Sequence, residues 1–182
     1  QNATSHYFGQ GFANAFDIKF LNKENKLEAP YQTSWGCTTR MIGSLVMVHG
    51  DDRGLVLPPR IAPIKAIVIP IGSGEEVEKA LDTITEDLKD SLITYKVDNS
   101  NKSPGFKFAE AEVNGIPVRV EIGKRDLENG KITIDRRDTK EKYQVDKNID
   151  IVGYIKELLD IIQTDMFNKA KLRRDSQTYE AH

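Results

Sequence analysis

The stretch IKAIVIPIGSGEEVEKALDTITEDLKDSLITYKVD, residues 64–98, decides the fold of most of this chain. It begins with the apolar run IKAIVIPI, which is typical of a buried strand. The next segment, GEEVEKALDTITEDLKDSL, carries apolar residues at helical spacing and predicts an amphipathic helix. ITYKVD then predicts a second strand. Strand, helix and strand in this order indicate an α/β layer in which helices pack against a sheet.

The alternation of helices and strands continues toward the C-terminus. SPGFKFAEAEVNG predicts a short helix with Ser103 as its N-cap, Pro104 at its first position and Gly115 after its end. IPVRVEIG and KITIDRRD predict two more strands. Apolar residues at helical spacing then predict a long amphipathic helix from Ile151 to Arg173.

The first part of the chain has a different pattern. Residues 12–20, FANAFDIKF, alternate enough to predict a strand, and the polar loop NKENKLEAP follows. Residues 33–37, TSWGC, indicate a polar turn. Residues 38–49 predict a helix, with Thr38 or Thr39 able to cap its first turn.

Three prolines in LPPRIAP separate these two patterns, because proline interrupts both helices and sheet ladders. At 182 residues the chain could form one large domain or two small ones. We place a boundary at the prolines and expect one domain over residues 1–60 and another over residues 61–182.

The composition is that of a globular chain with a charged surface. Hydrophobic residues make up 38% and charged residues 30%, and the apolar runs are too short to span a bilayer, so we expect no membrane segment. A single cysteine, Cys37, excludes an internal disulfide and suits a reducing cytoplasm. The formal charge of -2 excludes a uniformly basic surface, so any RNA contact must rest on local patches. QNATSHYFGQ carries neither an initiator Met nor a signal pattern, and we expect a cut end there.

Arg40 lies in the first turn of the predicted helix, where the helix dipole disfavours a cation. One explanation is a salt bridge with Asp51 or Asp52. The other is a phosphate site, because a helix N-terminus with an arginine and neighbouring threonine hydroxyls suits an anion.

A second polar constellation lies in the predicted α/β domain. Glu112 and Arg119 bracket the turn between a helix and a strand. A carboxylate accepts from guanine N1 and N2, and an arginine donates to O6 and N7, so such a pair suits unpaired guanines. The other interpretation is an intradomain ion pair, with Phe108 in the core.

Four blocks of the sequence, in order, resemble the prolyl-tRNA synthetases, a family of class II aminoacyl-tRNA synthetases. The blocks are TSHYFGQGFANAFDIKF, YQTSWGCTTRMIG, VHGDDRGLVLPPRIAP and SPGFKFAEAEVNGIPVRVEIGKRDLENG. The resemblance runs from Gln1 to His182. It implies the C-terminal part of an antiparallel class II catalytic sheet, followed by an α/β anticodon-binding domain with a mixed sheet flanked by helices.

The resemblance also implies an activity and its residues. The family activates proline with ATP and transfers it to tRNA(Pro), as a cytoplasmic homodimer, with Mg2+ accompanying ATP and no metal site in this chain. Arg40 is implied as the catalytic residue. The implied ATP-binding residues are Gln1, Thr38 and Arg40. The implied proline-binding residues are Thr4, His6, Trp35 and Gly36. The implied anticodon-binding residues are Phe108, Glu112, Arg119, Arg125, Asp126 and Lys142.

The sequence departs from the family in several places. Motif 1, which builds the dimer interface, and motif 2, which grips ATP, would precede Gln1, and a C-terminal module would follow His182. Gly11 stands where members usually carry Asn. We therefore expect this chain alone not to activate proline, and the incomplete sheet to expose an edge and apolar surface.

Two other functions are compatible with parts of the sequence. The first is a non-catalytic RNA-binding protein built on the anticodon-binding module, which the retained TTR and TSH segments argue against. The second is a small α/β protein in which Arg40 binds an inorganic anion.

Overall fold

The computed structural model describes residues 1–180 and divides the chain into two compact units, with the division between Leu45 and Val46. Segment 46–60, predicted from sequence to belong to the first domain, is part of the second unit. Val56 belongs to the core of that unit, and the Leu55 N–H donates to a backbone carbonyl 3.1 Å away at the end of a helix of the same unit.

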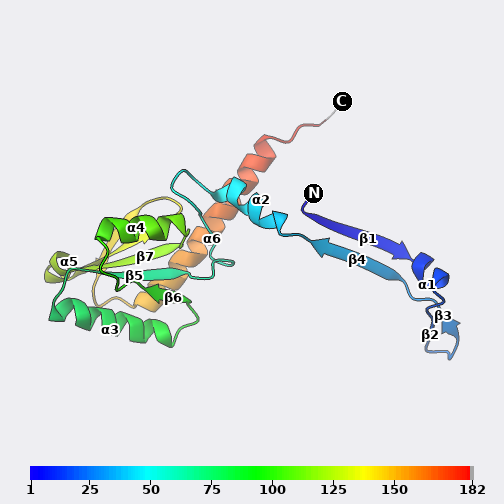
Figure 1. Cartoon of the computed structure of the whole chain (residues 1–182), viewed down its shortest axis with the longest axis horizontal. Coiled ribbons are helices and arrows are strands. Elements are labelled where there is room, and N and C mark those ends of the chain that lie inside the picture. Colours follow the sequence, from blue (N-terminus) through cyan, green and yellow to red (C-terminus); the bar gives the residue numbers. More distant parts are fainter. Residues whose placement is uncertain (181–182) are drawn as a thin grey trace. The chain divides into compact units, whose positions relative to one another are not determined.

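The second unit is built on a five-stranded mixed sheet with strand order β6-β5-β7-β8-β9 (Figure 1). β5 runs parallel to β6 and β7, whereas β8 runs antiparallel to both of its neighbours, β7 and β9. The strands are β5 (Ala66–Ile71), β6 (Tyr95–Val97), β7 (Val118–Gly123), β8 (Lys131–Arg136) and β9 (Lys142–Asp146). The predicted mixed sheet is confirmed, and β9 is an additional edge strand.

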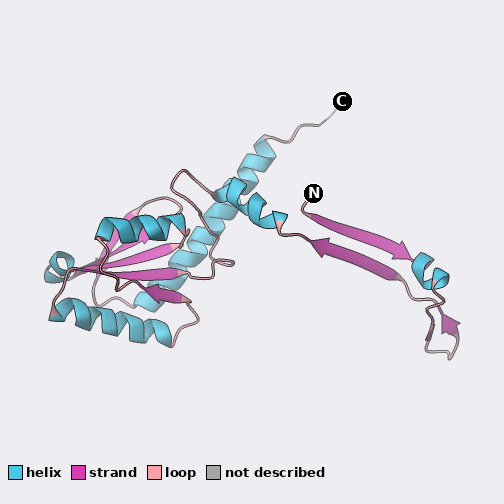
Figure 2. Ribbon diagram, in the orientation of Figure 1, coloured by secondary structure: helices cyan, strands magenta, loops and turns pink. Residues whose placement is uncertain are grey.

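The helices of this unit follow the predicted order. They are α3 (Glu75–Lys89), α4 (Pro104–Val113), α5 (Lys124–Glu128) and α6 (Ile151–Ser176) (Figure 2). The caps of α4 confirm the sequence signals: the Ser103 hydroxyl accepts from the Phe106 N–H at 3.4 Å, and Gly115 has φ +67. The short helix α5 was not predicted.

Period-two alternation gives the two faces of the sheet different characters. On β7, Val118, Val120 and Ile122 are fully buried in the main core, which α3, α5 and α6 complete. Arg119 and Glu121 point to the opposite face. There α4 covers β5, through a smaller apolar cluster, and lies across the sheet from α3 (Figure 1). The face over β7, β8 and β9 therefore carries polar side chains.

The first unit is a small ribbon with little interior. Its antiparallel pair is β1 (Ala3–Gly9) with β4 (Gln32–Cys37), and β2 (Phe20–Leu21) pairs with β3 (Leu27–Glu28). Within residues 1–45, Ala13 alone is buried. Tyr7 is 71% exposed and Trp35 79%. The expectation of exposed apolar surface is confirmed.

Two predictions for the first unit are wrong. Residues 12–20 are not a strand: α1 (Gly11–Ala15) occupies their first part, where the Phe16 N–H donates to the Phe12 carbonyl at 3.0 Å. These two rings are four residues apart and stack, with centroids at 6.4 Å, so their spacing is helical. Residues 33–37 form strand β4 rather than a turn, because β1 supplies the pairing partner.

The predicted helix after this strand is confirmed as α2 (Arg40–His49), the element on which the two units divide. The Thr38 hydroxyl donates to the Asn2 carbonyl at 3.3 Å, so it bonds to the start of β1. Over residues 1–180, every helix is too short or too polar to cross a membrane.

Candidate functional site

Four of the six residues predicted to contact an anticodon, Phe108, Glu112, Arg119 and Lys142, gather on the polar face over β7, β8 and β9. The strand register places Arg119 opposite Asp135, and Asp135 opposite Lys142. Cross-strand partners share a face, so these three side chains form one row across three strands. Glu121, two residues after Arg119, lies on the same face.

Acidic side chains hold the Arg119 guanidinium in place. Its Nε donates to Glu121 at 2.9 Å, its Nη2 lies 2.9 Å from Asp135, and only 6% of its side chain is exposed. Lys142 Nζ lies 2.9 Å from the same Glu121 carboxylate. Burial raises the pKa of Asp135, an effect that the positive charges of Arg119 and Lys142 oppose. Both cations therefore favour the ionised form of Asp135.

Phe108 and Glu112 extend this network from α4. The half-buried Phe108 ring lies under two cations, with Arg119 Cζ 4.4 Å and Lys142 Nζ 5.3 Å from its centroid. Glu112 Oε1 lies 3.7 Å from Arg119 Nη1, so the ion pair of the alternative interpretation is present. Phe108 also packs on the small apolar cluster under α4, so it has a structural role as well.

The two α5 candidates differ in their connection to this face. Asp126 accepts a hydrogen bond at 3.2 Å from Thr133, which lies on the polar face of β8, so it belongs to the margin of the site. Arg125 is exposed, and within the described part of the chain its guanidinium forms neither an ion pair nor a hydrogen bond.

Sequence reasoning missed three members of the site. The strand pattern could have identified two of them. Glu121 lies two residues after Arg119 on the same strand and so shares its face, and Asp135 lies opposite Arg119 on the neighbouring strand. Arg53 had no such signal: it lies in the segment after α2, and its Nη1 is 3.4 Å from both Glu112 carboxylate oxygens. Arg53 and Glu112 are far apart in the sequence, so their contact can be recognised only in the folded structure.

In the first unit, the structure brings together the three residues predicted to bind ATP. Arg40 Nη1 donates to the Gln1 carbonyl at 3.2 Å, and the Thr38 N–H donates to the Asn2 carbonyl at 3.0 Å. The Arg40 side chain is exposed and makes no ion pair among residues 1–180. The proposed partner Asp51 instead pairs with arginine and lysine side chains of the second unit.

The residues predicted to bind proline lie on β1 and β4 but on two faces. Thr4 is opposite Gly36, and His6 two residues later points to the same side. Trp35 is opposite Ser5, so its indole belongs to the other face of the ribbon. The ribbon alone therefore does not bring all four residues to one side.

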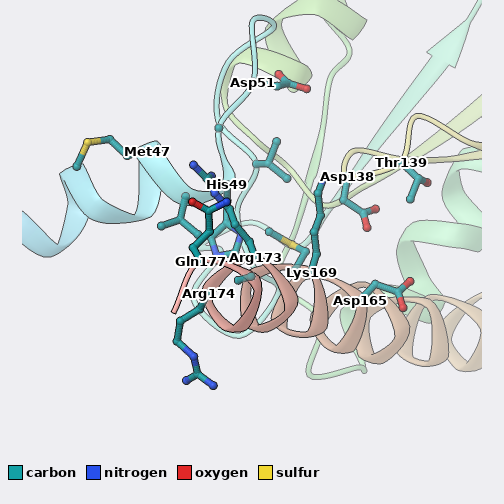
Figure 3. Close-up of a pocket in the computed structure, with 15 residues that line it drawn as sticks. Met47, His49, Asp51, Asp138, Thr139, Asp165, Lys169, Arg173, Arg174 and Gln177 are labelled. Atoms are coloured by element: carbon teal, nitrogen blue, oxygen red, sulfur yellow. The ribbon is translucent and has the colours of Figure 1, made fainter. Parts of the chain in front are cut away.

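A cavity of about 830 Å³ lies elsewhere in the second unit, between the last residues of α2 and the C-terminal half of α6 (Figure 3). His49, Lys169 and Arg173 lie together on one side of it (Figure 3). Burial, followed by the Lys169 charge, lowers the pKa of His49. None of the residues predicted to bind a ligand lines this cavity.

Comparison with known proteins agrees with this geometry. The family model described as "Anticodon binding domain" matches residues 65–158, which carry the polar face. The proline–tRNA ligase of Lachnoclostridium phytofermentans is 51% identical over 186 aligned positions, which cover 100% of this chain and 38% of that protein. The chain thus spans well under half the length of this relative.

Solved structures match both units. The prolyl-tRNA synthetase of Cryptosporidium parvum in complex with L-proline and AMP superposes with a TM-score of 0.87 at 38% identity, covering 97% of this chain and 38% of that one. A structure of the same enzyme with halofuginone and AMPPNP has the same TM-score and covers 37% of that chain.

Proposed function

Because the chain belongs to the anticodon binding domain family, we propose that it forms part of a proline–tRNA ligase. This enzyme would activate proline with ATP and esterify tRNA(Pro). The observation that carries the proposal is the 51% identity to a proline–tRNA ligase along the whole chain, in both units. A homodimeric, cytoplasmic whole enzyme belongs to the same proposal.

The second unit would recognise the two guanines of a proline anticodon. Glu112, with 21% of its side chain exposed, would accept from guanine N1 and N2. Arg119 would donate to O6 or N7 once the flexible Lys142 side chain, 48% exposed, swings aside. Phe108 would stack on a base, which is worth about 1 to 3 kcal/mol in single-strand complexes. Arg125 and Asp126 would border this contact.

The first unit would contribute the nucleotide side of the catalytic site. Arg40 suits the ATP phosphates because its guanidinium is exposed at a helix N-terminus and anchored by the Gln1 carbonyl, with Thr38 beside it. A proline carboxylate oxygen would attack the α-phosphorus and pyrophosphate would leave. The terminal ribose hydroxyl of tRNA would then attack the prolyl carbonyl carbon, and AMP would leave. Arg40 would neutralise charge on the transferring phosphate.

The β1–β4 ribbon would contribute to the amino-acid side. Thr4 and His6 would supply polar contacts on one face of the ribbon, with Gly36 opposite Thr4 allowing close approach, whereas Trp35 would present an apolar wall on the other face. Mg2+ would arrive with ATP. In residues 1–180 no three His, Cys, Asp or Glu side chains gather to hold a metal ion.

A chimera tests this proposal. Residues 1–182 replace the aligned part of the Lachnoclostridium phytofermentans ligase, and prolylation of tRNA(Pro) is measured. We expect activity, with proline-dependent pyrophosphate exchange abolished by Arg40→Ala and retained by Arg60→Ala, a matched change at another exposed arginine. A folded chimera without prolylation, or one indifferent to Arg40→Ala, would contradict the assignment.

A further inference from the structure

Arg137 is one of the most buried charged residues in the described part of the chain, and it binds the backbone of the residue proposed to recognise guanine. It follows β8, and 3% of its side chain is exposed. Its Nε donates to the Glu112 carbonyl at 3.0 Å. Its Nη1 and Nη2 donate to the two carboxylate oxygens of Asp51 at 2.9 and 2.6 Å. The planar guanidinium thus bonds to the Glu112 carbonyl through Nε and to Asp51 through Nη1 and Nη2. This fixes the position of Glu112 relative to Asp51 more strictly than a lysine ammonium would.

The Asp51 end of this contact is itself held. Its carboxylate also accepts from the Arg53 N–H at 2.9 Å and lies 3.3 Å from Lys140 Nζ. These bonds, with the Arg137 hydrogen bond first, lower the pKa of Asp51, which therefore stays ionised at neutral pH. Arg53, anchored through its backbone here, reaches the Glu112 carboxylate with its side chain.

The same segment closes on the end of α4 through the backbone. The Leu55 N–H donates to the Val113 carbonyl, and a Cβ at Gly54 would lie 2.5 Å from the Val113 Cα. The C-terminal turn of α4 is thus held by hydrogen bonds from two sides, from segment 51–55 and from Arg137. Glu112 lies at that turn.

We propose that Arg137, with Asp51, is a positioning residue for guanine recognition: it holds the Glu112 backbone so that the carboxylate meets guanine N1 and N2 together. The inference rests on the proposed anticodon function. Arg137 is too buried to touch RNA itself. Recognition of two adjacent donors by one carboxylate needs placement within a fraction of an ångström, which a supporting contact of this kind supplies.

Arg136 provides a matched control. It is the preceding residue, is buried to the same degree, and donates to Asp138 at 2.8 Å and to Asp165 at 2.9 Å. None of these contacts involves Glu112. Removing either arginine takes a buried guanidinium away from two ion-pair contacts or more and costs stability, but the inference predicts that only one of the two changes affects base discrimination.

The test is binding of the 182-residue chain to a stem-loop RNA with two adjacent loop guanines, compared with the same RNA carrying inosine at each. Inosine lacks only the N2 amine, so the affinity ratio reports the Glu112 carboxylate. We expect a ratio of about tenfold for the unchanged chain. Arg137→Met should lower it to about twofold, and Arg136→Met should leave it unchanged. Arg137→Met/Asp51→Asn removes both charges, so that the measurement can be made on a folded variant.

The ratio separates positioning from simple loss of stability, because a partly unfolded sample binds both RNAs less well in proportion. An unchanged ratio in folded Arg137 variants would overturn the positioning role while leaving guanine recognition intact. No guanine preference in the unchanged chain would overturn both.

Discussion

Replacing Arg119 by methionine is expected to destabilise the second unit, and the amount follows from its contacts. The guanidinium is 2.9 Å from both Glu121 and Asp135, with 6% of its side chain exposed. Breaking a buried ion pair by removing one partner costs about 3 to 5 kcal/mol. Lys142, at 2.9 Å from Glu121 and 4.0 Å from Asp135, still compensates part of the acidic charge. We therefore expect about 3 kcal/mol, or a fall in Tm of about 6 to 12 °C.

The loss should depend on pH with a definite sign. Burial already raises the pKa of Asp135, and Arg119 opposes this shift. Without the arginine, that pKa rises further above its unfolded value, so the folded state binds more protons than the unfolded state. Stability then falls as pH rises through the folded pKa and recovers as pH falls. Thermal unfolding over a series of pH values from neutral to acidic measures the difference.

The double variant Arg119→Met/Asp135→Asn provides the internal control. Removing the stranded carboxylate should restore about 1 to 2 kcal/mol at neutral pH and abolish most of the pH dependence, because the two residues are in contact and their effects do not add. An equal loss at every pH of the series, or a double variant no more stable than the single one, would refute this account of the network.

Five further substitutions, in three groups, test other parts of the structure. Gly115→Ala should cost about 2 kcal/mol or more in urea unfolding, because φ is +67 and a Cβ would lie 2.6 Å from a neighbouring side chain, whereas Gly130→Ala, with φ +70 and open space, should cost about 1 kcal/mol. Ser103→Ala should lower stability by about 1 kcal/mol through loss of the α4 N-cap, which urea titration followed by circular dichroism detects. Lys142→Ala should reduce the salt slope of RNA binding by about 0.7, whereas Phe108→Ala should weaken binding by about 1 to 3 kcal/mol without changing that slope.

The second unit is predictable from sequence because its core imposes periodicity on the chain. The run that becomes β5 is apolar on both faces, and α3 and α6 carry apolar residues at helical spacing because each buries one side. β9 escapes prediction because KYQVD is a short edge strand with alternating exposed and half-buried positions. The first unit gives weak signals for the same physical reason: with one buried residue in 1–45, burial leaves almost no pattern.

The candidate site illustrates a different limit. The sequence offers two interpretations of Glu112 and Arg119, an ion pair or a pair that recognises guanine, and treats them as alternatives. The geometry makes them compatible. A guanidinium has five N–H donors; here Nε donates to Glu121, and Nη2 forms an ion pair with Asp135. Arg119 Nη1 lies 3.7 Å from Glu112, close enough for an ion pair but too far for a hydrogen bond. Within residues 1–180, the Nη1 donors are therefore free to bind the same guanine that the Glu112 carboxylate would bind. An arginine fixed by two acids while it keeps one edge for a ligand is better organised for recognition than a solvated one, and such an arrangement follows from strand register, which residue identity alone does not specify.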